Sequence, residues 1–454
     1  GGIGAGPLTQ VPRGEQYRIG HDGTKFGIPE VDKNATACTN IHQGGIVQDQ
    51  SGQWWALLMM DFHSIGRTVT LAPITWKDGW PMLGLEGNLG RAPRTWLKPN
   101  IPNTPDTPYS PYQRNEDFNG KTLSRIWQWN HNPDDTKWSL KKGRLRLQSM
   151  PAEQLMWARN TLTQRVIGPT SIATVELYLD GLKDGDVAGL GNINVPCSWI
   201  GVSLPPGFSS RRKDAYYVRC FEQLTNDTTS VDIAAIDGNI DKIWLRMVGD
   251  YDQDSAHYEF SVDGAAFEQL GRKMPLSYQL ISFQGSRHAL FTFNTKGKQG
   301  GYAEFDNFTV EEPQADRRQN IPYGKTFRII NLATGRPAIA LDHGVLYDTH
   351  PSDNSAKTRF RLIDKGQGKV IVQCEDGRYI FCSGFGIAGD VRLTNDASKA
   401  EVFLWQDYLN HEFMLMSMRT HRYIGKSPTT GSPYSMDFPG ADPARRNGAV
   451  FRWE

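Results

Sequence analysis

In the N-terminal part of the chain, the side chains best able to bind a polar ligand or move a proton are His42, Asp61, His63 and Arg67. Histidine titrates near neutral pH, whereas the arginine guanidinium stays charged and offers a fork of donors to paired oxygens. Asp61 and His63 are two positions apart, so on a strand they face the same side. Taken alone, His42 is more often a structural histidine that bonds a turn. For Arg67 the alternative to a binding role, which we favour, is a surface ion pair worth about 0 to 1 kcal/mol.

The elements that position these residues are three short β-strands, expected over 44–49, 53–60 and 67–74 and joined by tight turns. Such a unit is one antiparallel meander or one blade of a β-propeller, and a propeller closes with at least about four blades. Residues 1–98 contain one such unit, so if it is a blade, they are only the C-terminal part of a propeller. The other blades are then expected upstream of Gly1 or in another chain.

The rest of the chain divides at proline-rich and polar boundaries. Within 99–114, every third residue from Pro99 to Pro111 is proline, which matches the three residues per turn of polyproline II and predicts an extended strap. Residues 115–312 alternate β runs with Gly, Asn and Asp turns, which predicts a two-sheet β-sandwich of the jelly-roll kind. The predicted fold class is all-β.

An internal threefold repeat occupies residues 322–454. Its units open with Gly335–Leu341, Gly377–Ser383 and His421–Ser427 and close from Phe360, Phe403 and Phe451. Units of about 40 residues that cannot bury their own apolar faces, present three times, are typical of a lectin-like or fascin-like β-trefoil. We expect this C-terminal domain to bind carbohydrate. His421, Tyr423 or Trp405 could stack a sugar, although none of them is singled out.

Composition narrows the possible partners. The 50 Lys and Arg residues balance 49 Asp and Glu residues, giving a net charge of +1, so no global field attracts nucleic acid. The apolar run 54–60 is far shorter than the roughly 20 residues that cross a bilayer, and we expect no membrane span. Five cysteines without CxxC spacing indicate neither a zinc site nor a dense disulfide framework. Cys374 and Cys382 could pair, but two buried thiols are the preferred interpretation.

Two groups of motifs resemble one family of enzymes. The first group is 42–55 (HQGGIVQDQSGQWW), 60–67 (MDFHSIGR) and 75–82 (TWKDGWPM). It resembles the last blade of the five-bladed propellers of family 43 glycoside hydrolases, which include β-xylosidases and α-L-arabinofuranosidases. The second group is 117–120 (DFNG), 127–133 (WQWNHNP), 160–165 (NTLTQR) and 183–189 (KDGDVAG). It resembles the concanavalin-A-like sandwich that follows that propeller, so the resemblance covers roughly residues 36 to 310.

The resemblance implies an inverting hydrolysis. One carboxylate activates water and a carboxylic acid protonates the leaving oxygen, with the two groups about 6.5 to 9.5 Å apart. No position of this chain matches those carboxylates, so no catalytic residue is identified and we expect them upstream of Gly1. Asp49, Asp61 and Asp78 match positions that carry no catalytic proton.

The resemblance also implies binding roles for the candidate residues. His42 corresponds to a histidine at the bottom of the family's substrate pocket, and Arg67 to the pocket arginine that binds sugar hydroxyls. Asp61 and His63 are expected at the rim. Tryptophans at strand and turn positions are usually core, so we expect Trp54, Trp55, Trp76 and Trp80 to be buried in the blade rather than to stack on sugars.

No cofactor is required by this chemistry, although a structural Ca²⁺ is possible. Asp117 and Asp306 lie near the first and last strands of the predicted sandwich, where related sandwiches can hold calcium through oxygen ligands. We therefore name these two carboxylates as the candidate metal ligands.

The sequence thus predicts the C-terminal portion of an exo-acting glycosidase. Its expected partners are plant cell-wall polysaccharides or oligosaccharides (xylan, arabinoxylan or arabinan), attacked at xylosyl or arabinofuranosyl ends. Such polymers are extracellular, so the protein is expected to be secreted, periplasmic or on the cell surface. The alternative is a non-catalytic carbohydrate-binding or scaffold protein built from a sandwich and a trefoil.

Overall fold

The computed structural model describes residues 41–85, 101–103, 114–168, 170–204, 215–223, 229–251, 254–277, 284–312, 321–342, 344–346, 350–382, 391–407, 412–419, 423–426, 435–438 and 448–454. These residues group into two compact units, one drawn from Phe62–Arg67 and Thr107–Gln314 and the other from Gly1–Asp61, Thr68–Asp106 and Ala315–Glu454. Most of the predicted strap 99–114 lies outside the described residues.

Strands dominate the described structure. Its helical segments are four three-residue 3₁₀ turns, η3 (His63–Ile65), η4 (Leu155–Trp157), η5 (Ala356–Thr358) and η6 (Ala397–Lys399). None of the helices found in the described part of the chain is long and apolar enough to span a membrane.

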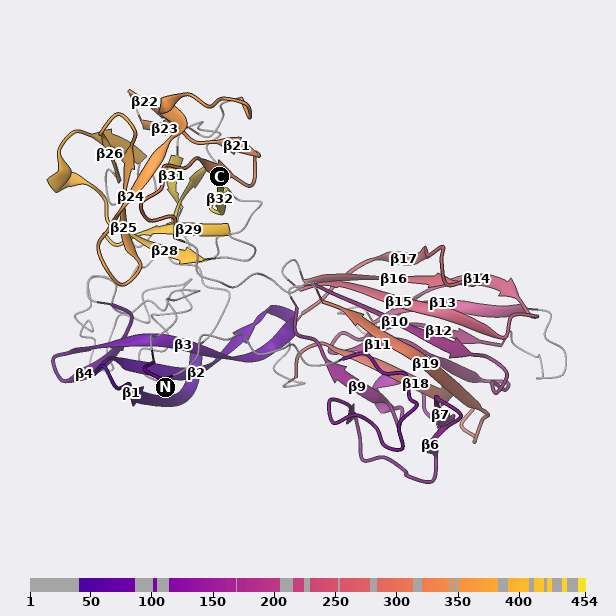
Figure 1. Ribbon diagram of the computed structural model, residues 1–454. Helices are drawn as coiled ribbons and strands as arrows, with labels where there is room; N and C mark the ends of the chain where they lie inside the picture. Colours follow the sequence, from indigo (N-terminus) through magenta and orange to yellow (C-terminus); the bar gives the residue numbers. More distant parts are fainter. Residues whose placement is uncertain are drawn as a thin grey trace. The chain divides into compact units, whose positions relative to one another are not determined.

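The N-terminal described segment is a four-stranded antiparallel meander (Figure 1). Its strands follow chain order: β1 (Ile41–Gln48), β2 (Trp54–Phe62), β3 (Gly66–Lys77) and β4 (Trp80–Leu83). The three predicted strands are confirmed, and β4 is an addition. Asp78 and Gly79 join β3 to β4 at φ values of 52° and 79°, the left-handed conformation that a two-residue hairpin loop requires.

Burial in the meander follows one face. The buried cluster consists of Ala56, Leu58, Ala72, Ile74 and Leu83. Trp55 is buried as expected, but Trp76 is 45% and Trp80 is 72% exposed. The expectation that all four tryptophans are core is therefore wrong for these two. Trp76 shares the face of Ile74 and contacts Trp54 at a centroid distance of 5.4 Å, but it lies at the end of that face beside the β3–β4 turn. Trp80 is an odd number of residues from the buried Leu83, so it points to the other side of β4.

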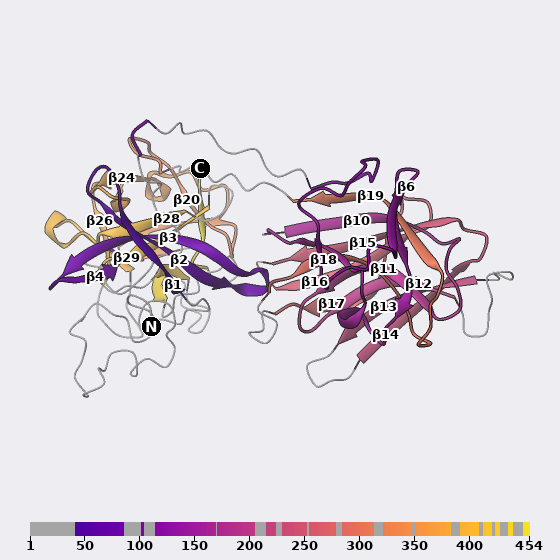
Figure 2. The same cartoon turned by 90° about the horizontal axis from the view of Figure 1, so that it is seen from below.

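Two antiparallel sheets stack to form the predicted sandwich (Figures 1 and 2). The seven-stranded sheet runs β17 (Glu268–Pro275), β16 (Ser255–Ser261), β15 (Lys242–Asp250), β10 (Thr170–Tyr178), β19 (Tyr302–Glu311), β7 (Arg144–Gln148) and β6 (Trp138–Lys141). The eight-stranded sheet runs β14 (Thr229–Asp237), β13 (Ala215–Gln223), β12 (Ser198–Ser203), β11 (Asp186–Ile193), β18 (Arg287–Asn294), β9 (Leu162–Arg165) and β5 (Gln128–Trp129), with β8 (Met150–Pro151) parallel to β18.

Alternating side chains create the sandwich core. Along β15 every second residue is buried, because successive side chains of a strand point to opposite faces of its sheet. Inward-facing residues of both sheets, such as Leu245, Phe305, Leu190 and Ile200, belong to one buried cluster.

Six strands of the C-terminal domain close into a ring. They pair in the order β20 (Ile329–Asn331), β32 (Phe451–Trp453), β29 (Glu412–Ser417), β28 (Phe403–Asp407), β25 (Lys369–Cys374) and β24 (Phe360–Asp364). A bridge between Phe327 and Phe360, with backbone hydrogen bonds of 3.0 and 2.8 Å, joins the two ends.

Each sequence repeat also contributes one hairpin outside the ring. The hairpins are β22 (Ile339–Leu341) with β23 (Gly344–Leu346), β26 (Tyr379–Cys382) with β27 (Val391–Thr394), and β30 (Tyr423–Lys426) with β31 (Ser435–Phe438); the short β21 (Arg336–Pro337) pairs with β20. The equivalent repeat positions Phe360, Phe403 and Phe451 are each fully buried, so the repeat marks the residues that build a shared core.

Cysteine chemistry agrees with the preferred interpretation. Cys374 and Cys382 are both buried thiols that form no disulfide. Burial raises the pKa of Cys374 to about 12, which keeps this thiol protonated and unreactive at neutral pH.

Candidate functional site

The four predicted sugar-site residues lie where β1 begins, β2 ends and β3 begins. His42 is in β1, whose pairing with β2 shifts register between Ile41 and Gly44. Asp61 is in β2 and Arg67 is in β3, where its side chain is half-buried. His63 opens the η3 turn, so the strand periodicity used to place Asp61 and His63 on one side does not extend across both residues.

The β2–β3 connection, residues 62–67, belongs to the sandwich unit. Ser64 is fully buried, and its backbone N–H and hydroxyl donate to Asp254 Oδ1 at 2.9 and 2.6 Å. Its carbonyl accepts from the backbone N–H of Ser286 at 2.7 Å. A single serine is thus bonded to two separate loops of the sandwich.

Apolar packing and close backbone approach reinforce this anchor. Ile65 is 6% exposed and belongs to the main sandwich core. A Cβ atom at Gly285 would lie 1.7 Å from the carbonyl oxygen of Ile65, so only glycine permits the approach. Arg165 donates through Nη2 to the carbonyl oxygen of Arg67. The sandwich therefore fixes the backbone on which Arg67 stands.

Asp49 lies in the turn between β1 and β2, and Asp78 lies in the turn between β3 and β4. Asp49 accepts hydrogen bonds from the backbone of Ser51 and Gln53 and from the indole of Trp55. The hydrogen bonds from Ser51 and then Trp55 lower the pKa of Asp49. Asp78 occupies the positive-φ turn between β3 and β4. Both positions have a conformational explanation.

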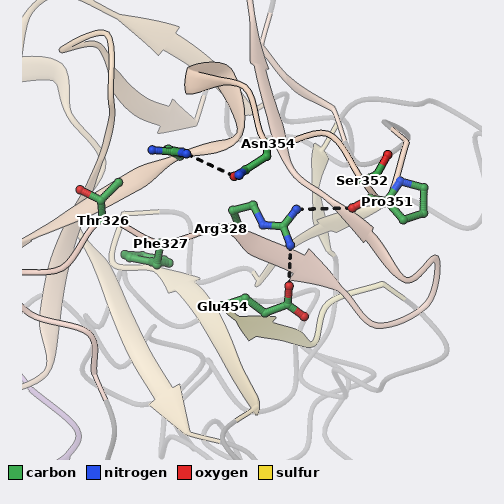
Figure 3. A pocket seen from close by; sticks show the side chains of 8 residues that line it. Thr326, Phe327, Arg328, Pro351, Ser352, Asn354 and Glu454 are labelled. Carbon is green, nitrogen blue, oxygen red and sulfur yellow. Dashed lines mark hydrogen bonds and ion pairs between the residues drawn. The ribbon is translucent and has the colours of Figure 1, made fainter.

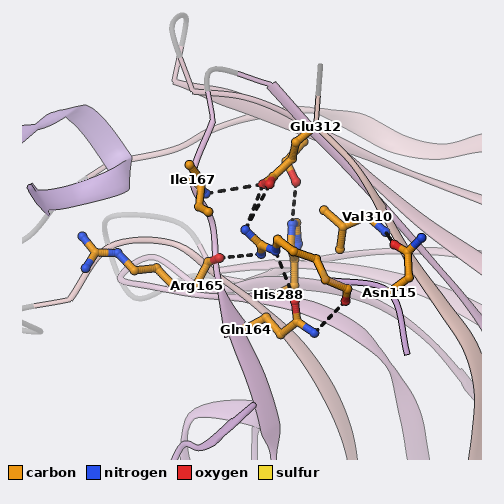
Figure 4. A network of polar contacts seen from close by, with 9 residues as sticks. Asn115, Gln164, Arg165, Ile167, His288, Val310 and Glu312 are labelled. Carbon is orange, nitrogen blue, oxygen red and sulfur yellow. Dashed lines mark hydrogen bonds and ion pairs between the residues drawn. The ribbon is translucent and has the colours of Figure 1, made fainter. Parts of the chain in front are cut away.

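A buried ion pair joins the two ends of the sandwich segment. Arg114 and Glu312, whose side chains are each 9% exposed, approach to 3.1 Å. Arg114 also donates to Gln164 and to the carbonyl oxygen of Arg165, while the backbone N–H of Ile167 donates to Glu312 (Figure 4). Burial lowers the pKa of Arg114, and the negative charge of Glu312 opposes that shift.

Two further buried polar side chains face this pair. His288 is fully buried, and its Nε2 lies 2.9 Å from the Ser171 hydroxyl. Burial and then the charge of Arg114 lower the pKa of His288 to about 3, so the ring is neutral at physiological pH. The hydroxyl of Tyr251 and Nδ1 of His288 have no hydrogen-bond partner in the described structure. The cluster therefore has a structural role, and these two polar atoms make no hydrogen bond within the described structure.

Of the candidate calcium ligands, Asp306 lies in β19, an inner strand of the seven-stranded sheet, and Asp117 lies in the segment that precedes β5. Burial raises the pKa of Asp306, and the nearby carboxylate of Asp117 acts in the same direction. Asp117 itself is exposed and accepts from the backbone of Asn119 at 3.1 Å. Among the residues that the structure describes, no group of three or more His, Cys, Asp or Glu side chains has an arrangement that could hold a metal ion. Calcium binding by Asp117 and Asp306 stays a prediction.

The C-terminal aromatic candidates are core residues. Trp405 is 4% exposed and stacks on Phe413 with a centroid distance of 3.8 Å. Tyr423 is 3% exposed and donates its hydroxyl proton to Gln406. The expectation that either ring could stack an external sugar is therefore wrong, because both rings fill the interior. His421 lies outside the described residues.

A polar pocket of about 490 Å³ lies instead at the rim of the six-stranded ring (Figure 3). Its polar lining consists of Thr326, Arg328, Ser352, Asn354, Arg359 and Glu454. Sequence reasoning missed this pocket because these residues come from three separated segments, and of them only Glu454 belongs to a repeat motif. The one available signal was the change of residue type at equivalent repeat positions.

Comparison with known proteins shows which proteins this chain is related to. Residues 115–311 match the family described as the beta xylosidase C-terminal concanavalin A-like domain of family 43. The chain is related to the family 43 β-xylosidases. It is 29% identical over 252 residues to a putative beta-xylosidase of Xylanibacter ruminicola, covering 54% of this chain and 44% of that protein. It is 28% identical over 300 residues to a beta-xylosidase of Formosa agariphila, covering 59% of this chain and 47% of that protein.

A solved structure extends the relationship to glycoside hydrolase architecture. The bifunctional GH43-CE protein of Bacteroides eggerthii aligns with a TM-score of 0.51 and 30% identity, over 72% of this chain and 38% of that one. The chain thus spans less than half the length of these β-xylosidase relatives. The predicted concanavalin-A-like sandwich is confirmed by the family match.

Proposed function

We propose that this chain is the C-terminal portion of a glycoside hydrolase that removes xylosyl or arabinofuranosyl ends from plant hemicellulose with inversion. The observation that carries the proposal is the β2–β3 connection. Residues 62–67, which hold Arg67, share a compact unit with the domain that the β-xylosidase family matches. A carbohydrate-binding sandwich that functioned alone would not require the connection between two strands of a separate sheet to be buried in its core.

In this proposal the meander is the last blade of a five-bladed propeller, and residues upstream of Gly1 supply the acid and base carboxylates. Arg67 would bind sugar hydroxyls, since its guanidinium offers several donors in one plane at any working pH. His42 would lie at the base of the same pocket, with Asp61 and His63 at its rim. The carbonyl bond from Arg165 and the Ser64 anchor would limit the motion of Arg67 during turnover.

We also propose that the C-terminal domain is a β-trefoil that holds the enzyme near its polymeric substrate. The closed six-stranded ring and one hairpin from each of three repeats support that assignment. A polymer substrate implies a secreted, periplasmic or cell-surface enzyme. Calcium at Asp117 and Asp306 would be structural, since these carboxylates face no proposed sugar contact.

The test is hydrolysis of 4-nitrophenyl β-xyloside and 4-nitrophenyl α-L-arabinofuranoside by the complete protein encoded with this chain. Arg67→Lys keeps the positive charge and removes the fork, so we expect kcat/KM to fall by about 10- to 100-fold. Arg125→Lys is the matched control, because Arg125 is exposed on the sandwich, and it should leave turnover unchanged.

Turnover of either glycoside that depends on Arg67 supports the proposal. Absence of turnover on both substrates, together with binding to insoluble xylan, would overturn it in favour of a non-catalytic carbohydrate-binding protein. Equal loss in the Arg67 and Arg125 variants would contradict the specific role of Arg67.

A further inference from the structure

The threefold repeat allows the rim pocket of the C-terminal domain to be compared with its two equivalents. Arg328 and Glu454 are direct cross-strand partners, with backbone N···O distances of 2.8 and 3.1 Å. Counting from the buried phenylalanines Phe360, Phe403 and Phe451, the residue three positions further on is Ile363, Gln406 or Glu454.

The strand register pairs each of these residues with its own partner. Ile363 pairs with Ile371, and Gln406 pairs with Met414. One junction is thus aliphatic and one is closed by a buried Gln406 that accepts from Tyr423. Among the three equivalent cross-strand pairs, only Arg328–Glu454 is charged, so the polar pocket is not a by-product of the repeat.

Arg328 is held in place on several sides. Its guanidinium contacts Glu454 at 2.7 Å and the carbonyl oxygen of Pro351 at 3.4 Å (Figure 3). It also donates to the carbonyl oxygen of Asp353 at 3.1 Å. This arrangement neutralises Arg328 and orients the Glu454 carboxylate, which remains 39% exposed. The pair forms a rigid polar wall that can accept and donate hydrogen bonds without further ordering.

Arg359 is the pocket cation without an anionic partner among the described residues. Its side-chain hydrogen bond is a long one, 3.4 Å from Nη2 to Asn354 Oδ1. Its backbone is fixed by bonds to Ala356 and Glu375 of 3.1 and 3.0 Å. A guanidinium has five N–H donors, so most of those of Arg359 remain available to a ligand. Arg361, bonded to Thr326 on the pocket wall, adds positive charge at the rim.

We propose that this pocket binds the carboxylate of an acidic sugar, a hexuronic acid unit of a polysaccharide. A planar carboxylate matches the guanidinium fork of Arg359 with two parallel hydrogen bonds. The sugar hydroxyls face Ser352, Asn354 and Glu454. The lining holds two arginines and one glutamate, and Arg452, which contacts Glu454 at 2.8 Å, and Arg361 add positive charge beside it, which favours an anionic ligand. A volume of about 490 Å³ accommodates one pyranose ring and its attachment to a chain.

This inference rests on the carbohydrate-binding part of the proposed function and does not depend on hydrolysis. The experiment is calorimetric titration of the full chain with methyl β-D-glucuronoside, methyl β-D-glucoside and xylotetraose. The first two probes differ only in the carboxylate at C6. We expect one site per chain for the glucuronoside and about tenfold or greater weakening for the glucoside.

Variants separate the pocket from general charge. Arg359→Gln should weaken glucuronoside binding by about tenfold or more, and Arg359→Lys should lie between it and the native chain. Lys399→Gln removes a charge from a 69% exposed side chain of the same domain and should leave binding within about twofold. Circular dichroism checks that each variant is folded; the probe comparison on the native chain stands even if a variant is not.

Equal binding of glucuronoside and glucoside, no binding of the glucuronoside, or full affinity in Arg359→Gln would overturn the inference. Binding of xylotetraose without the glucuronoside would overturn it while leaving the proposed glycan-binding function intact. Absence of hydrolysis together with glucuronoside binding would support the inference and contradict the proposed hydrolytic function.

Discussion

The meander and the sandwich are both antiparallel sheets, but they differ in what makes them stable. The buried cluster of the meander has five residues, whereas the main cluster of the sandwich has 33 among those described. The meander also exposes Trp76 and Trp80. A sheet with so small a core gains too little hydrophobic free energy to stand alone.

The sandwich has the opposite character. It buries an ion pair, a neutral histidine and the serine of the β2–β3 connection inside a large apolar interior. Buried polar groups require partners, so the sandwich is specified by a few polar contacts as well as by its core. We infer that the connection derives its order from the sandwich rather than from the meander.

The largest expected effect is on the buried ion pair. Arg114→Ala leaves the Glu312 carboxylate buried without its partner and should lower the free energy of unfolding by about 3 to 5 kcal/mol. Chemical denaturation followed by tryptophan fluorescence measures this loss. Lys296→Ala breaks an exposed pair with Asp184 and should cost at most about 1 kcal/mol. Equal losses for the two variants would contradict the claim that the buried ion pair contributes more to stability than the exposed one.

A pH series tests the neutral histidine. Because the pKa of His288 is about 3 in the folded protein and about 6.5 in an unfolded chain, the unfolded state alone binds its proton between these values. The contribution of neutral His288 to the free energy of unfolding is therefore fully present above pH 6.5. It declines as the pH falls below that value, by about 1.4 kcal/mol per pH unit. His288→Asn should remove this component from the slope of unfolding free energy against pH. A variant slope equal to the native one would contradict burial of a neutral ring.

The anchor of the connection is a smaller target. Ser64→Ala removes the hydroxyl that donates to Asp254 and should cost about 1 to 3 kcal/mol of sandwich stability. Ser64→Ala combined with Asp254→Asn in a double-mutant cycle isolates the shared contribution. Strict additivity would mean that the two residues do not interact in solution.

The smallest effect is expected in the meander hairpin. Trp80 is 72% exposed, and Trp80→Ser should change the free energy of unfolding by less than about 0.5 kcal/mol. A loss above about 1 kcal/mol would show that this ring is covered in solution and would weaken the contrast with the sandwich.

The sequence predicted the elements whose signal is local. Runs of β-forming residues between Gly, Asn and Asp turns identified the sandwich strands, such as those that became β10 and β15. The phenylalanines that close the three repeats were found because each fills an equivalent core position. The β4 strand was missed because it has four residues and contains Pro81.

Long-range polar contacts could not be predicted in the same way. Arg114 and Glu312 are 198 positions apart, and neither residue belongs to a repeated or periodic pattern. The C-terminal pocket likewise joins Arg328, Arg359 and Glu454 through ring closure. The interior positions of Trp405 and Tyr423 were also hidden, since a repeat does not tell whether an aromatic ring faces the core or solvent.

Native-state hydrogen exchange of the full chain tests most directly whether the sandwich holds the residues that carry Arg67. The amides of Ser64 and Ser286 bond within this anchor. They should exchange with the same opening free energy as sandwich amides of β18, and more slowly than those of the β3–β4 hairpin. Exchange of Ser64 at the rate of the hairpin, with β18 still protected, would contradict the account.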